Sequence, residues 1–129
     1  MAGMLGAAHL VAFAPTTDLA VARAFYADAL GLRVADDTAY AVVFDAHGTM
    51  LRLTPVDSFD PDPFTVLGWA VTDIEAAIDG LRERGVLFTT YDGLGQDERG
   101  IWTAPDGSRI AWFRDPDGST LSLTQSAGR

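Results

Sequence analysis

Composition and charge limit what this chain can do. Its 129 residues, 48% hydrophobic and 21% charged, are typical of a globular protein with one domain or two small fused modules. The formal net charge of −9 argues against nucleic acid or an anionic membrane as a partner, because both attract clustered Lys and Arg. The chain has no cysteine, which excludes disulfides, thiolate metal ligands and cysteine nucleophiles.

The sequence carries no sign of a membrane span or a secretory signal. It has no apolar run of about 18 residues, and the apolar stretch 4–14 is short and lacks a basic start. We therefore expect a cytoplasmic protein without a membrane partner.

The first half of the chain predicts a strand, a helix and three further strands. Thr17 or Asp18 can cap the helix, whose apolar residues follow helical spacing up to Gly31, a residue typical of the position just past a helix. The expected strands cover residues 7–14, 32–36, 40–44 and 49–56. Residues 57–63, with three acids and two prolines, predict an exposed linker.

The second half predicts the same order of elements. Residues 72–75 match a capping box, in which the Thr72 hydroxyl and the Glu75 carboxylate each bind a free amide at the helix start, and Gly85 ends this helix. The expected strands cover residues 64–71, 86–91, 101–104 and the two arms of a closing hairpin within 110–124. Residues 92–100 form a loop that is either a lid or a solvated connection.

The turn of the closing hairpin is Arg-Asp-Pro-Asp-Gly, residues 114–118. Pro116 fixes φ, Asp115 and Asp117 can bind nearby amides, and Gly118 tolerates a positive φ. Residues 42–54 (VVFDAHGTMLRLT) repeat the pattern of residues 110–124 (IAWFRDPDGSTLSLT), including the turn glycine and two leucines. Together with the repeated order of elements, this predicts an α+β fold of two tandem βαβββ modules.

Two motifs point to a known family. The segments FYADALGL (25–32) and FRDPDGSTLSL (113–123) resemble the vicinal oxygen chelate superfamily, which includes glyoxalase I, bleomycin-resistance proteins, fosfomycin-resistance enzymes and extradiol dioxygenases. The resemblance implies curved sheets around a concave cavity in a single domain, 1–129. Its modules would be 7–56 and 64–125, joined by the linker 57–63. It also implies a homodimer.

The resemblance implies a divalent metal held by His, Gln or Glu in catalytic members. The corresponding positions here hold Ser122, Arg52 and Val66. Ser122 is a poor metal ligand, Arg52 is a cation, and the Val66 side chain has no donor atom. His9 is the candidate for the first strand, nine residues before Asp18 where seven are usual. We therefore predict no metal, and a divalent ion held through His9 is the alternative.

Without a metal, the cavity itself is the functional feature. Strand alternation places Arg52 and Ser122 on cavity faces, where Arg52 could hold a carboxylate, phosphate or enolate. Arg52 fits a rim position or an ion pair equally well. Trp112, opposite in parity to Phe113, and Trp102 could stack on a flat ligand. The predicted ligand-binding residues are His9, Arg52, Trp102, Trp112 and Ser122.

The sequence therefore predicts a metal-independent small-molecule-binding protein of the glyoxalase/bleomycin-resistance type, which binds or sequesters a partly aromatic, anionic ligand. The alternative is a lyase, isomerase or dioxygenase of the same superfamily, with or without a metal. A dimeric scaffold with a filled cavity is a third interpretation.

Overall fold

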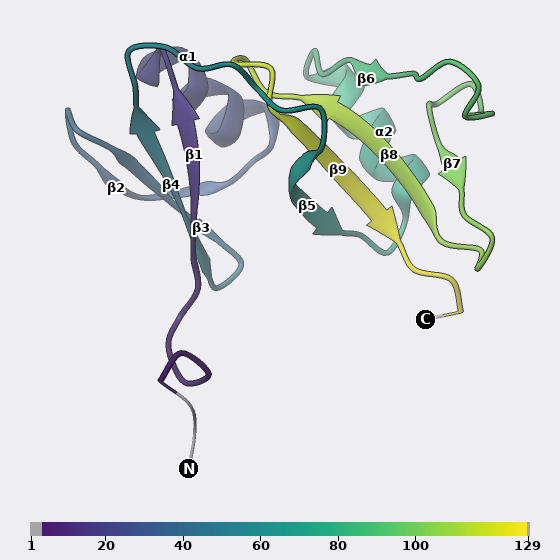
Figure 1. Cartoon of the computed structure of the whole chain (residues 1–129), viewed down its shortest axis with the longest axis horizontal. Helices are drawn as coiled ribbons and strands as arrows, with labels where there is room; N and C mark the ends of the chain where they lie inside the picture. The colour runs from purple at the N-terminus through teal and green to yellow at the C-terminus, as the bar shows by residue number, and fades with distance from the viewer. Residues whose placement is uncertain (1–3, 129) are drawn as a thin grey trace. The chain divides into compact units, whose positions relative to one another are not determined.

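The chain consists of two compact units, each with its own sheet. A computed structural model describes residues 4–128, and the first unit ends at Phe59 while the second begins at Asp60 (Figure 1). Each unit has the order strand, helix, strands, so the α+β fold with two βαβββ modules is confirmed. No helix within residues 4–128 has the length and hydrophobicity that a membrane crossing requires.

The first unit is a four-stranded mixed sheet with a helix on one face. Its strands lie in the order β1-β4-β3-β2, with β1 parallel to β4 and the other neighbours antiparallel. The elements are β1 Val11–Thr16, α1 Leu19–Ala24, η1 Phe25–Ala29, β2 Arg33–Asp37, β3 Val42–Ala46 and β4 Thr49–Pro55.

The second unit repeats this topology with one additional short strand. Its sheet order is β5-β9-β8-β6, with β5 parallel to β9, and β7 also pairs with β8. The elements are β5 Thr65–Ala70, α2 Ile74–Glu83, β6 Phe88–Thr89, β7 Trp102–Thr103, β8 Arg109–Arg114 and β9 Thr120–Gln125. Helix α2 lies behind β8 and β9 in Figure 1.

Each sheet buries one face under its helix. In β4 the leucines Leu51 and Leu53 are buried while Arg52 between them is exposed, as strand alternation predicts. In the second unit Phe113 is fully buried, and its ring lies 6.4 Å from that of Trp69 and 5.3 Å from that of Phe88. The opposite face of each sheet is therefore the one available to a ligand.

The first strand begins later than the sequence predicts. Residues 4–8 form turns, and β1 starts only at Val11, which pairs with Met50, because its partner β4 begins at Thr49. The strand also continues through Pro15, which an edge strand tolerates. His9 consequently lies outside the sheet and is exposed.

The first helix changes its winding halfway. Asp18 caps it by accepting a hydrogen bond from the Val21 N–H (3.2 Å). From Phe25 the helix is a π-helix, and the Leu30 N–H donates to the Phe25 carbonyl (3.0 Å). This π-helical turn carries the fully buried Tyr26 and therefore packs into the core of the unit.

The second helix does not use the predicted capping box. Asp73 is the N-cap and accepts a hydrogen bond from the Ala76 N–H (3.1 Å). The Gln125 Oε1 accepts from the Ile74 N–H (2.9 Å). Glu75 instead accepts from Arg109 (2.7 Å), because β8 brings that guanidinium within reach, a long-range pair that local spacing does not reveal.

Two predicted strands are shorter or displaced. The strand predicted at 40–44 begins at Val42, because Thr38 closes a turn with Ala41 (Thr38 N–H to Ala41 C=O, 3.0 Å). The strand predicted at 86–91 is reduced to Phe88–Thr89. From Thr89 onward the Gln96 side chain forms hydrogen bonds with backbone groups of Thr89 and Tyr91 that would otherwise pair with a neighbouring strand.

The closing turn has the predicted chemistry. The buried Asp115 carboxylate accepts hydrogen bonds from the Asp117 and Ser119 N–H groups, both at 3.0 Å. Gly118 has φ +88, and a Cβ added there would lie 3.0 Å from Cγ of Pro61. The turn therefore requires glycine for both its conformation and the close approach of residue 61.

We expect Gly118→Ala to lower the free energy of unfolding by about 1–2 kcal/mol, because the left-handed conformation is costly for a residue with a Cβ. Urea unfolding measures this change. Gly80→Ala is the matched control, since Gly80 lies within α2 and an added Cβ meets nothing within 4 Å. The control is expected to stabilise by about 1 kcal/mol, and equal effects of the two variants would contradict this account of the turn.

Candidate functional site

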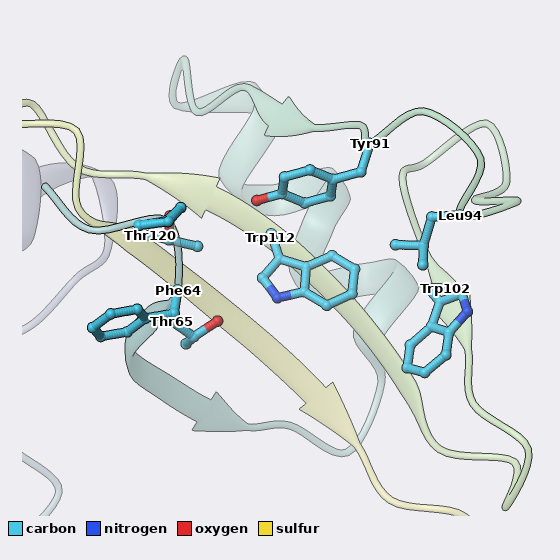
Figure 2. A pocket seen from close by; sticks show the side chains of 8 residues that line it. Phe64, Thr65, Tyr91, Leu94, Trp102, Trp112 and Thr120 are labelled. Carbon is cyan, nitrogen blue, oxygen red and sulfur yellow. The ribbon is translucent and has the colours of Figure 1, made fainter.

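A pocket of about 390 Å³ opens on the exposed face of the second sheet. Figure 2 shows Phe64, Thr65 and Thr120 on one side of it, Leu94 and Trp102 on the other, and Trp112 between them. The lining residues are Pro63, Phe64, Thr65, Tyr91, Leu94, Trp102, Trp112 and Thr120. They come from four strands and two connections of one unit, so this unit alone forms the pocket.

Four of the eight lining residues are aromatic. The Tyr91 ring meets Trp112 edge-on, with centroids 5.6 Å apart and planes at 84°. Trp102 lies on the other side of Trp112, with centroids 6.3 Å apart and planes at 33°. Both tryptophans are half-buried, so their rings support one another while part of each surface remains accessible.

The strand register explains why these side chains meet. Trp112 pairs with Ser122 on β9 and with Thr89 on β6, and Trp102 pairs with Ile110, two residues before Trp112. Because residues two apart share a face, both tryptophans lie on the face opposite the buried Phe113. The alternation in the sequence therefore predicts the correct face for Trp112.

Ser122 lies beside the pocket without lining it. It is 7% exposed and pairs with Gly68 on one side and Trp112 on the other. A Cβ added to Gly68 would lie 2.7 Å from the Ser122 Oγ, so the hydroxyl occupies the space that the glycine leaves. Gly68 and Ser122 therefore fill each other's space at this position.

The loop 92–100 is held in place by hydrogen bonds. Gln96 Oε1 accepts from the Tyr91 N–H (2.6 Å), while its Nε2 donates to the carbonyls of Thr89 (3.0 Å) and Gly100 (2.7 Å). Asp97 Oδ1 accepts from the Ile101 N–H (2.9 Å). These bonds fix Tyr91 and the start of β7, which supports a static wall over a lid.

An ion-pair network joins the same loop to helix α2. Arg99 donates to both carboxylate oxygens of Asp79 (3.0 and 3.1 Å), and Glu75 lies between Arg99 (3.6 Å) and Arg109 (2.7 Å). Hydrogen bonding from the Arg99 guanidinium lowers the pKa of Asp79 below its ordinary value of 3.8. The Asp79–Arg99 ion pair is therefore charged at neutral pH, and its contribution is lost only as the pH falls through that lowered pKa.

Neither candidate in the first unit lines the pocket of the second sheet. Arg52 is exposed on β4 between Phe13 of β1 and Val43 of β3, and it makes no ion pair with any residue from 4 to 128. His9 is exposed before β1. Ligand binding by His9 and Arg52 stays a prediction.

Several lining residues were not named as candidates by the sequence. Phe64 and Thr65 flank the start of β5, Thr120 begins β9, and Leu94 lies in the loop. Thr120 shares its face with Ser122 by simple alternation, so it could have been found. Leu94 could not, because its position depends on the side-chain hydrogen bonds of Gln96.

The positions at which the resemblance implies metal ligands carry weak donors on the second sheet. Within residues 4–128 no group of three or more His, Cys, Asp or Glu side chains is placed to hold one. On the second sheet, the ligand positions that the resemblance implies hold the alkyl side chain of Val66 and the nearly buried hydroxyl of Ser122.

We expect Gln96→Glu to lower the free energy of unfolding by about 1–3 kcal/mol, because the amide donor is lost and a carboxylate then faces two carbonyl oxygens. Urea unfolding measures the stability, and near-ultraviolet circular dichroism reports the tryptophan packing. Gln125→Glu is the matched control, since Gln125 Oε1 accepts from the Ile74 N–H at the start of α2. A carboxylate is favourable there, so a loss in the control as large as in Gln96→Glu would contradict the assigned role.

Comparisons with known proteins agree with this architecture. The fold is similar to a lactoylglutathione lyase from Agrobacterium tumefaciens, with TM-score 0.68, 21% identity and coverage of 95% of this chain and 98% of that one. It is also similar to a superfamily member from Sphaerobacter thermophilus, with TM-score 0.71, 27% identity and coverage of 93% and 98%. No curated protein matches the chain. The family model described as Glyoxalase/Bleomycin resistance protein/Dioxygenase superfamily matches residues 6–123, and the chain therefore belongs to this superfamily.

Proposed function

We propose that this chain is a small-molecule-binding protein whose second unit takes up a flat, partly aromatic molecule in the pocket beside Trp112. The observation that carries the proposal is the aromatic wall of Tyr91, Trp102 and Trp112, with ring centroids 5.6 and 6.3 Å apart. Accessible aromatic faces in a concave site favour stacking with a planar ligand.

The size of the pocket supports binding over a filled scaffold. A volume of about 390 Å³ lies within the range of roughly 300–1,000 Å³ that is usual for small-molecule sites. Fixed walls also favour binding, because little conformational entropy is lost when the ligand enters. The hydrogen bonds of Gln96 supply this rigidity.

The chemistry of the lining supports a binding role over acid–base catalysis. The described lining residues contribute hydroxyls from Thr65, Tyr91 and Thr120 but no carboxylate, imidazole or amine. A general base or an activated nucleophile requires such a group within hydrogen-bond reach. We therefore propose binding or sequestration, with Trp102 and Trp112 as the contacts.

We expect the protein to bind 2-naphthamide, a flat neutral probe, and expect Trp112→Leu to weaken that binding about fivefold. The leucine keeps an apolar side chain but removes the stacking surface. Isothermal titration calorimetry measures both dissociation constants. Tyr40→Leu is the control, because Tyr40 is 83% exposed in a turn of the first unit. Equal weakening in both variants, or none in Trp112→Leu, would count against the pocket.

We propose that the pocket works without a resident metal, since Val66 and Ser122 offer no suitable donor set. The purified protein is then expected to carry well under one equivalent of Mn, Fe, Ni or Zn after mild chelation, as measured by mass spectrometry of the elements. A stoichiometric metal that resists chelation and disappears in His9→Ala would refute this part of the proposal and favour the enzymatic alternative.

A further inference from the structure

We propose that Arg114 gives the aromatic pocket an anion-binding end, so that the ligand is a planar aromatic molecule bearing a carboxylate or similar oxyanion. This inference rests on the proposed function and adds the charge of the ligand and the residue that selects it. The neutral part would stack at Trp112, and the oxyanion would lie toward the threonine end of the pocket.

The strand register places Arg114 at that end. Arg114 pairs with Thr120 on β9, and Thr120 pairs with Thr65 on β5, so the three residues form one row across the sheet. Both threonines line the pocket. Arg114 is two residues beyond Trp112 on β8 and therefore shares its face of the sheet. Directly paired residues have Cβ atoms about 5 Å apart, well within the length of an arginine side chain.

Arg114 is also uncommitted. It is exposed, and its guanidinium makes no hydrogen bond or ion pair with any residue in the described range 4–128. The other arginine of β8, Arg109, donates to Glu75 (2.7 Å). The adjacent Asp115 carboxylate accepts from backbone N–H groups of the turn. An unpaired guanidinium is unexpected in a chain of net charge −9, since acidic side chains are abundant.

The row is polar, whereas the other lining residues are aromatic or aliphatic and their one hydroxyl is that of Tyr91. The threonine hydroxyls can donate to an oxyanion, and a guanidinium can bind a carboxylate through two parallel hydrogen bonds. Aromatic rings alone would also attract a cation. A cationic ligand is disfavoured, however, because Arg114 pairs directly with the lining residue Thr120 and its positive charge would repel a cation there.

Three probes with the same ring test the inference by calorimetry at low salt: 2-naphthoate, 2-naphthamide and trimethyl(2-naphthyl)ammonium. The wild-type protein is expected to bind the naphthoate about tenfold more tightly than the naphthamide, as a charge-assisted contact would give. In Arg114→Gln the naphthoate should fall to the affinity of the naphthamide, while naphthamide binding stays unchanged.

The matched control is Arg109→Gln, which removes the same charge from the same strand but on the opposite face, and it should keep the tenfold preference. Equal binding of naphthoate and naphthamide to the wild type would overturn this inference alone. So would tightest binding of the ammonium probe, or loss of the preference in Arg52→Gln with retention in Arg114→Gln. Binding of none of the three probes would overturn the proposed function as well.

Discussion

The second unit depends on one buried carboxylate. Asp115 is 6% exposed, and its oxygen binds the Asp117 and Ser119 N–H groups, which closes the turn between β8 and β9. The turn fixes the register of the two central strands of this sheet. A shift by one residue would move Trp112 to the buried face and Phe113 to the exposed one. The core and the pocket are therefore set by the same interaction.

A second set of polar contacts builds the part of the pocket that the sheet cannot supply. The side chain of Gln96 replaces a strand ladder beyond Thr89 and holds the loop that carries Tyr91 and Leu94. Arg99 then joins this loop to α2 through Asp79. The pocket thus lies between a sheet with a fixed register and a loop with fixed hydrogen bonds. Such a site favours selective binding of a rigid molecule.

The superfamily establishes the fold of this chain but not its chemistry. Members share paired βαβββ modules, and function depends on the side chains placed on the open sheet faces. In the second sheet the positions at which the resemblance implies metal ligands hold Val66 and Ser122, where a metal enzyme would require stronger ligands. Homodimer formation stays a prediction, because a single chain does not test it.

The sequence alone determined the features that depend on local chemistry and on alternation. The DPDG turn, the glycine after each helix and the inward leucines follow from φ preferences and from the period of two along a strand. The same alternation assigned Trp112 to the open face and Phe113 to the core. The tandem repeat in the sequence predicted that both modules have the same order of strands and helix.

Only the tertiary structure decided which distant residues meet. His9 lies outside β1 because its partner strand β4 begins too late to pair with it. Glu75 binds Arg109, 34 residues away, in place of its local capping role. Thr65 and Leu94 line the pocket, Thr65 through the strand register and Leu94 through the hydrogen bonds of its loop. Pairing between strands and side-chain bonds across loops depend on distances in space, which spacing along a chain does not specify.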